Sequence, residues 1–335
     1  FPRPVPGPRS LRPRGPLSVS FQMSPRVSIL VPCYNASRWL AATLESALAQ
    51  TWAPVEIVVV DDGSRDDSLA VARGFEARGV TVIAQANRGA SAARNRAIAA
   101  SRGEWLQFLD ADDLISPDKI ARQMEALARR PPGTVASCAW GRFRDDPAEA
   151  VFSDASVARD FSAVDFLVHC SGGHYMMHPS AWLTPRTVVE RAGPWDETLT
   201  LNDDGEYFCR VLLAGTGIAF VPGAQSFYRS GLAGSLSQRR DDRSRRSQFR
   251  SVESIDRHLL AAEDSPRTRR AVANYYQHFI HDFFPAPADL MRRAADRVAA
   301  LGGSSLRPSM GPKTAAAARW LGWKNVWRLR HWLRR

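Results

Sequence analysis

Three features of the sequence predict an α/β fold with a doubly wound, mostly parallel sheet. Short apolar runs alternate with segments of helical periodicity from residue 27 to about residue 140. The run at 57–60 is apolar and β-branched at consecutive positions, which is typical of a strand covered on both faces. Polar or acidic turns follow three of the runs, where ligands bind in such sheets. This alternation favours right-handed βαβ units with helices on both faces.

The individual elements follow from local signals. We expect strands at residues 27–31, 57–60, 80–84, 105–109 and 135–140. Pro32 is expected to end the first strand, and residues 38–50 place their apolar side chains on one helical face. Ser91 is expected to cap the third helix, and the fourth is expected to end at Pro131.

The second half of the chain has fewer strand signals. The pattern is irregular over 143–184, and we then expect helices at 185–191 and 204–213 and a strand at 218–221. From Arg239 the chain reads as basic and helical, with a break at residues 285–287. We therefore expect three parts: a disordered, non-native segment 1–22 with the physiological start at Met23, a catalytic domain 23–235, and a helical C-terminal extension 236–335.

Charge narrows the possible partners. The 335 residues carry a formal net charge of +11, which suits nucleic acid, an anionic membrane or an anionic substrate. The excess lies at the ends, because residues 1–22 and 313–335 contain no acid and the middle is mixed. Since no nucleic-acid-binding motif accompanies this charge, we do not expect nucleic acid as a partner.

The spacing of the cysteines and the length of the apolar runs indicate the cellular location of the protein. The four cysteines include no C-x-x-C pair, so we expect free thiols in a reducing cytoplasm and no zinc site. No apolar run approaches the roughly 20 residues that a membrane span needs, and we expect no secretory signal. We expect a cytoplasmic protein, with peripheral attachment to the inner face of the cell membrane as the alternative.

The strongest chemical signal is the acidic cluster Asp110-Ala111-Asp112-Asp113, which follows an apolar strand. Carboxylates at alternate positions past a strand end can converge on one hard cation such as Mg²⁺ or Mn²⁺. An isolated D-x-D is more often a solvated turn that caps the next helix. The nucleotide-binding signals elsewhere in the sequence favour the metal site here.

Two further turns are candidates for nucleotide binding. Asp61-Asp62-Gly63-Ser64 follows a valine-rich strand, where an acid can accept from a base or a ribose hydroxyl. The same residues also suit an ordinary turn, and the two interpretations stay open. Residues 31–35 expose backbone after a strand, and Tyr34 there can flank a base; a simple strand-to-helix turn is the alternative.

Four segments in order resemble the bacterial family 2 glycosyltransferases of the GT-A fold. They read V-S-I-L-V-P-C-Y-N, V-V-V-D-D-G-S, N-R-G-A-S-A-A-R-N and F-L-D-A-D-D, and the resemblance covers residues 27–228. It implies a nucleotide-diphospho-sugar donor and a saccharide or lipid-linked saccharide acceptor. It also implies transfer with inversion, toward a cell-surface polysaccharide or glycolipid.

The resemblance implies a role for each polar turn. It implies contacts with the nucleotide sugar for Pro32, Tyr34, Asn35, Asp62, Gly89, Arg94 and Asn95. It places Asp110 near the ribose and the metal, and makes Asp112 the direct ligand of Mn²⁺ or Mg²⁺. Such a metal offsets charge on the departing nucleoside diphosphate. Asp113 receives no role.

Two later segments complete the resemblance. Residues 193–197 resemble a G-G-F-D-E segment and residues 202–207 an E-D-x-E-[LY] segment, in which Asp204 matches the general base. Asp203 replaces the usual Glu, and Asp204 can also act as an N-cap of the following helix. Tyr228-Arg229 resembles a Y-R segment, which implies a diphosphate contact for Arg229.

Two other features have open alternatives. His174 and His178 are four apart in a loop that contains Gly-Gly, so we favour packing or acceptor contact over metal binding. The tail 313–335 combines Trp and Arg, which suits an anionic membrane surface, with a docked C-terminal helix as the alternative.

Two rival functions are weaker. A sugar nucleotidyltransferase would need a glycine-rich, basic loop after the first strand, and Pro32-Cys33-Tyr34-Asn35 stands there instead. A non-catalytic binding or scaffold protein of the same fold would not need the three intact carboxylates at 110, 112 and 204.

Overall fold

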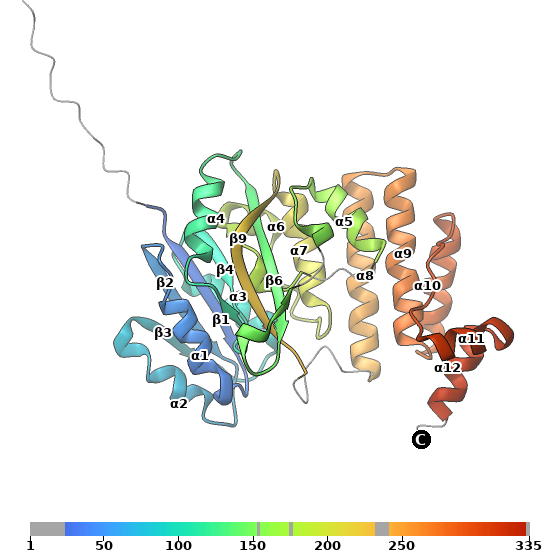
Figure 1. Ribbon diagram of the computed structural model, residues 1–335, viewed down its shortest axis with the longest axis horizontal. Helices are drawn as coiled ribbons and strands as arrows, with labels where there is room; N and C mark the ends of the chain where they lie inside the picture. Colours follow the sequence, from blue (N-terminus) through green and yellow to red (C-terminus); the bar gives the residue numbers. More distant parts are fainter. Residues whose placement is uncertain (1–23, 153–154, 174–176, 232–240, 333–335) are drawn as a thin grey trace, which may run out of the picture.

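A computed structural model describes residues 24–152, 155–173, 177–231 and 241–332 of the chain (Figure 1). The predicted disorder of residues 1–22 therefore falls outside the described residues. The strands are β1 Val27–Cys33, β2 Val55–Asp61, β3 Val80–Ala84, β4 Trp105–Phe108, β5 Leu114–Ile115, β6 Thr134–Phe143, β7 Val151–Phe152, β8 Thr184–Pro185 and β9 Gly217–Arg229.

The α-helices cover the two faces of the first sheet and form the C-terminal region. They are α1 Ser37–Leu48, α2 Ser68–Arg73, α3 Ala90–Ala100, α4 Lys119–Leu127, α5 Ala163–Ser171, α6 Arg186–Ala192, α7 Asp203–Ala214, α8 Asp242–Ala262, α9 Pro266–Phe283, α10 Ala288–Ala300, α11 Pro312–Leu321 and α12 Trp323–Trp332. None of these described helices is both long enough and apolar enough to cross a membrane.

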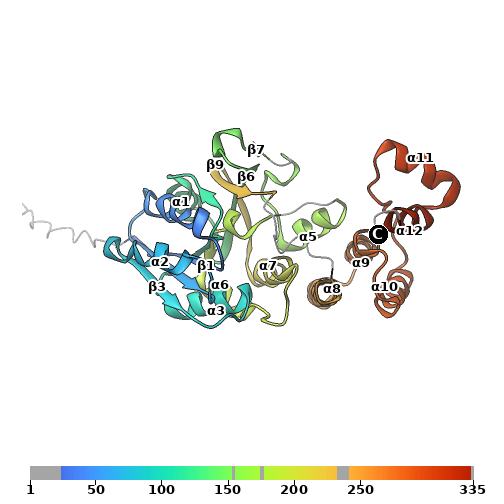
Figure 2. The same cartoon turned by 90° about the horizontal axis from the view of Figure 1, so that it is seen from below.

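The first sheet has the order β3-β2-β1-β4-β8, and only its last pair is antiparallel. Alternate residues of its central strands enter different cores. Ile29 and Val31 of β1 pack with α1, whereas Leu30 between them packs with α3 on the other face. Figure 2 shows α1 and α3 on opposite sides of this sheet. The α/β class and the mostly parallel sheet are confirmed, and the alternation explains the uninterrupted apolar runs.

The fifth predicted strand does not extend this sheet, contrary to expectation. It is β6, which pairs in parallel with β9 in a second sheet of order β5-β9-β6-β7. A single bridge between Ala136 and Leu183 links β6 to the chain segment just before β8. Apolar periodicity identifies a strand but not its partner, which here lies about eighty residues later in the chain.

Three local predictions were wrong in detail. β1 continues through Pro32 to Cys33. Pro32 has no N–H to donate, but this costs no hydrogen bond to β4 because the pairing with β4 has already ended at Leu30. The residue before α3 that acts as N-cap is Gly89, not Ser91. Helix α5 lies in the segment expected to be irregular; its signal was Ser162, whose hydroxyl accepts from the Asp165 N–H at 3.1 Å.

The C-terminal helices form a third core. Helices α8, α9 and α10 lie side by side (Figure 1) and pack through buried side chains such as Phe249, Leu259 and Phe279. Leu167 of α5 and Cys209 of α7 belong to the same core. The predicted break at residues 285–287 is confirmed, since α9 ends at Phe283 and α10 begins at Ala288. This packing joins the helical extension to α7, which carries the predicted base.

Candidate active site

Polar turns follow β1, β2 and β4, which are neighbours in the first sheet. The turn after β4 contains the acidic cluster, and the Asp113 N–H donates to the Asp110 carbonyl at 3.0 Å. Because parallel strands end at the same edge of a sheet, the turns at Pro32, Asp62 and Asp110 come together there. The structure therefore gathers at one edge the residues that the sequence assigned to the nucleotide and the metal.

Asp112 has an unusual electrostatic environment. Burial, together with the neighbouring Asp113 and Asp110, raises the pKa of its carboxyl group to about 8. Among the described residues there is no group of three or more His, Cys, Asp or Glu side chains arranged to hold a metal. Asp110 and Asp112 would supply two carboxylates, a donor set that fits a divalent cation with its other ligands from a substrate phosphate and water.

Asp113 is fully buried, and both of its carboxylate oxygens have partners within the protein. It accepts from the Arg229 N–H at 2.9 Å and the Ser180 hydroxyl at 3.3 Å, and lies 3.1 Å from His178 Nδ1. The other nitrogen of His178 lies 2.9 Å from Ser226 Oγ. Asp113 therefore holds the acidic turn against β9, a role that the sequence did not indicate because these partners are distant along the chain.

His178 belongs to this support. Burial lowers the pKa of its ring to about 3, so the imidazole is neutral. Its position behind Asp113 favours the packing interpretation over acceptor contact. His174, the other histidine of the pair, lies outside the described residues.

Arg94 links the acidic turn to the predicted base. Its guanidinium donates to Asp110 Oδ1 and to Asp203 Oδ2, each at 2.8 Å, and lies 4.5 Å above the Trp195 ring. Ser91, which does not cap α3, donates to the same Asp203 oxygen at 3.2 Å. Two carboxylates about ninety residues apart in sequence are thereby held on one buried cation.

Asp204 lies next to this pair, in the first turn of α7. The N-cap of α7 is Asn202, so Asp204 is not the cap that was the alternative. Burial and the neighbouring Asp203 raise the pKa of Asp204 to about 6, against the lowering effect of Arg94. A carboxyl group with this pKa is ionised at neutral pH and can accept a proton.

The turn after β2 organises the loop before α3. Asp62 accepts from the Arg88 N–H at 2.8 Å, the Gly89 N–H at 2.7 Å and the Gln85 side chain at 2.8 Å. Gly89 has φ +97, a conformation that glycine favours. Asp62 therefore shapes the loop that the sequence placed beside the nucleotide.

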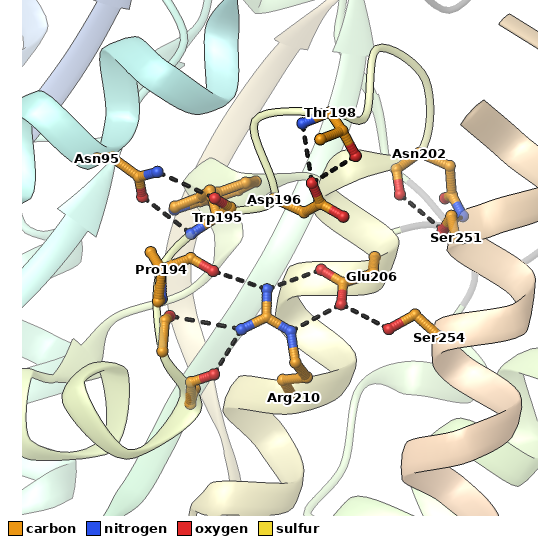
Figure 3. A network of polar contacts seen from close by, with 12 residues as sticks. Asn95, Pro194, Trp195, Asp196, Thr198, Asn202, Glu206, Arg210, Ser251 and Ser254 are labelled. Carbon is orange, nitrogen blue, oxygen red and sulfur yellow. Dashed lines mark hydrogen bonds and ion pairs between the residues drawn. The ribbon is translucent and has the colours of Figure 1, made fainter.

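The turn after β1 is more open. Tyr34 is 46% exposed, and Asn35 has φ +51 with its side-chain oxygen accepting from the Arg65 N–H at 2.8 Å. The side chain of Asn95 contacts the loop before α7. Its amide donates to the Trp195 carbonyl at 2.9 Å and to Glu197 at 3.1 Å, and its oxygen accepts from the Trp195 N–H. The side chain of Asn95 is thus occupied in holding the loop before α7 (Figure 3).

Arg229 lies at the end of β9, close to the acidic turn. Its guanidinium donates to the Asp112 carbonyl at 2.9 Å and to the Arg144 carbonyl at 2.6 Å. It also lies 4.1 Å from the ring centre of Trp39 and 4.3 Å from that of Phe143. Arg229 is therefore a buried cation beside the backbone of Asp112.

Comparison with known proteins identifies the central part of the chain. Residues 28–182 match the model of glycosyl transferase family 2. A glycosyltransferase of Rickettsia typhi is 28% identical over 195 residues, which are 56% of this chain and 59% of that protein. The succinoglycan biosynthesis protein ExoO of Rhizobium meliloti is 29% identical over 219 residues, 61% of this chain and 60% of that protein. The chain thus matches under two thirds of the length of these relatives.

Solved structures share the fold. TarS of S. aureus in complex with UDP has a TM-score of 0.58 at 14% identity, over 82% of this chain and 87% of that one. A mannosyltransferase of Pyrobaculum calidifontis, in complex with GDP-Man and Mn²⁺, has a TM-score of 0.53 at 18% identity, over 91% and 83%. The resemblance inferred from the sequence motifs is confirmed: residues 28–182 match the model of glycosyl transferase family 2, and the α/β core has the GT-A fold.

Proposed function

We propose that the protein is an inverting glycosyltransferase that moves a sugar from a nucleotide-diphospho-sugar to a hydroxyl of a saccharide or lipid-linked saccharide. The observation that carries this proposal is the buried connection from Asp110 through Arg94 to Asp203. It ties the turn that would hold the donor to the helix start that bears Asp204. A binding protein has no need for a carboxyl group with a pKa of about 6 at that position.

Relatives and structural neighbours support the substrate class. The neighbours were solved with UDP, UDP-GlcNAc or GDP-Man, which supports a nucleotide-sugar donor here. ExoO takes part in succinoglycan biosynthesis, which supports a role in polysaccharide synthesis.

The acidic turn suits Mn²⁺ or Mg²⁺. Asp112 and Asp110 would hold the cation together with the donor diphosphate, since a buried Asp112 next to two other acids needs a positive partner to be ionised. When bound, the cation would offset the negative charge that develops on the departing nucleoside diphosphate. The neighbour solved with Mn²⁺ supports this assignment.

The chain's own residues would supply the remaining steps. Asp204 removes the proton from the acceptor hydroxyl, whose oxygen forms the new bond to the anomeric carbon. The bond from that carbon to the diphosphate oxygen breaks on the opposite face, and the nucleoside diphosphate leaves. Arg94 holds Asp203, and through it the start of α7, beside the acidic turn, so the base and the donor are aligned before the reaction.

The tail is the proposed contact with an anionic membrane surface. The last acid of the sequence is Asp296, and residues 297–335 include nine Lys and Arg residues. Trp320 at the end of α11 is 91% exposed, and the cations Arg319 and Lys324 beside it are exposed. A membrane-bound enzyme would meet lipid-linked acceptors at that surface.

A substitution series tests the catalytic proposal. Nucleotide-sugars are first screened for Mn²⁺-dependent thermal stabilisation, which identifies the donor. Asp204→Asn should then keep this stabilisation and lose transfer by roughly 10²- to 10⁴-fold, whereas Asp112→Ala should lose both. Asp118→Asn, which removes an acid that is ion-paired at a distance from the site, is the control. Wild-type turnover in Asp204→Asn would refute the base assignment.

A further inference from the structure

Helix α8 presents a row of three buried serines to the region around Asp204. Ser247, Ser251 and Ser254 are spaced by four and three residues, which places them on one face of the helix. Each of them bonds to the loop before α7 or to α7 itself, as Figure 3 shows for Ser251 and Ser254. The row lies outside the residues that match the family.

Ser247 holds the loop that leads into α7. Its hydroxyl oxygen accepts from the Thr200 N–H at 2.7 Å and the Leu201 N–H at 2.9 Å. The same hydroxyl donates to the Leu201 carbonyl at 3.0 Å. Three backbone groups that would otherwise lack a partner are thus satisfied by one side chain.

Ser251 holds the residue at which α7 begins. Its hydroxyl donates to the Asn202 carbonyl at 2.9 Å and accepts from the Asn202 side-chain amide at 2.6 Å. Asn202 has φ +57, a conformation that a residue other than glycine keeps only when its surroundings support it. The lack of a side chain at Gly205 makes room for this arrangement, because a Cβ there would lie 2.3 Å from Oδ1 of the Asn202 side chain.

Ser254 extends the support to the loop after α6. It donates to Glu206 Oε1 at 2.8 Å, and the carboxylate of Glu206 accepts two bonds from Arg210, each at 2.7 Å. Arg210 donates in turn to the Pro194 carbonyl at 2.9 Å and to the Gly193 carbonyl at 3.4 Å. Figure 3 shows this chain of contacts crossing from α8 through α7 to that loop.

We propose that Ser247, Ser251 and Ser254 are positioning residues, which hold the first turn of α7 so that Asp204 stays in place relative to Asp110. Helix α8 can serve as this support because other side chains of it, among them Phe249, pack against α9 in the third core. The helical extension is then part of the catalytic machinery. The effect of these serines on catalysis rests on the proposed function, but their positioning of α7 can be measured without an activity assay.

The first test follows backbone opening at the start of α7. The control for Ser247→Ala, Ser251→Ala and Ser254→Ala is Tyr276→Phe. This control removes one buried hydrogen bond, from the Tyr276 hydroxyl of α9 to Asp256 of α8. Amide hydrogen exchange is measured over residues 200–206. We expect exchange there to quicken about fivefold or more in Ser247→Ala and Ser251→Ala, as one lost hydrogen bond predicts, and to stay unchanged in Tyr276→Phe. Unchanged exchange in both serine variants would overturn the proposal.

The second test follows catalysis in the same variants. Ser251→Ala should lower kcat about tenfold with little change in the donor KM, because the bonds of Ser251 go to Asn202 at the start of α7, which carries the proposed base. Tyr276→Phe should keep the wild-type kcat even if its Tm falls as far as that of Ser251→Ala. Equal kcat losses in the two variants would show that the row acts only through global stability. If the wild type transfers no sugar while exchange responds as expected, the proposed function fails and the positioning stands.

Discussion

Arg94 and Asp203 form a buried ion pair, with 2.8 Å between Nη1 and Oδ2. The same guanidinium reaches Asp110 at 2.8 Å through its other terminal nitrogen, and only 7% of the side chain is exposed. One cation therefore sits between two acids that come from different ends of the catalytic region. Its positive charge lies between these two partly buried carboxylates and offsets their negative charge.

Replacing Arg94 should damage both stability and transfer. Arg94→Met leaves two partly buried acids without a counter-charge, and breaking a buried pair in this way costs about 3 to 5 kcal/mol. Denaturant unfolding measures the loss. Arg78→Met is the control, because the Arg78–Glu45 pair lies on the surface and should contribute little. Equal destabilisation by the two substitutions would contradict the central role of Arg94.

Transfer should depend on the ionisation of Asp204. Burial and Asp203 raise its pKa to about 6, against the opposing effects of Arg94 and of its hydrogen bond with the Gly205 N–H. A base acts only when ionised, so kcat/KM should be level above this pKa and fall tenfold per pH unit below it. A pH profile measured with the identified donor checks this.

The variant Asp204→Asn provides the comparison for that profile. Asparagine has no carboxyl group to titrate, so the residual rate of this variant should lack the acid limb near pH 6. An acid limb of the same midpoint in the variant would assign the ionisation to another group.

The sequence predicted those parts of the molecule that local patterns determine. The apolar runs of β1, β2 and β4 identified the strands, and the turns at Asp62 and Asp110 identified the edge of the sheet at which we predict ligand binding. Both follow from residues that are close together in the chain. The motif match then gave Asp204 a role that its own sequence context, a turn before a helix, left ambiguous.

Contacts between distant segments were beyond the reach of those patterns. Asp113 looked like a spare member of the acidic cluster, and only the fold brings Arg229, Ser180 and His178 to it. The pairing of β6 with β9 is of the same kind, since an apolar strand carries no record of its partner. The sequence assigned Asn95 to the nucleotide, and its amide is engaged with the Trp195 backbone instead.

Asp113 should prove important for stability rather than for substrate binding. Asp113→Ala removes the acceptor for the buried Arg229 N–H and the Ser180 hydroxyl, and each unsatisfied group costs about 1 to 3 kcal/mol. Thermal unfolding measures the loss. Asp145→Ala, at an exposed acid near the same edge, is the control. A native Tm in Asp113→Ala would show that these contacts do not hold the turn.

The tail is not one continuous helix, and the break lies between Trp320 and Trp323. Gly322, with φ +73, divides α11 from α12. Trp323 packs against His281 and Phe284, with ring centres 5.1 and 5.3 Å apart, whereas Trp320 is almost fully exposed. The docked and the membrane-facing interpretations of the tail therefore apply to different residues.

Trp320 should accordingly contribute to membrane binding and not to folding. Trp320→Ala should weaken sedimentation with phosphatidylserine-containing vesicles about tenfold and leave the Tm unchanged, because its ring makes little contact with the protein. Added salt should weaken the binding of the wild type, since Arg319 and Lys324 supply the attraction to the anionic surface. Val151→Ala, at an apolar residue that is 74% exposed on β7, is the control. Removal of residues 313–335 should abolish vesicle binding, and undiminished binding after that truncation would exclude the tail as the membrane contact.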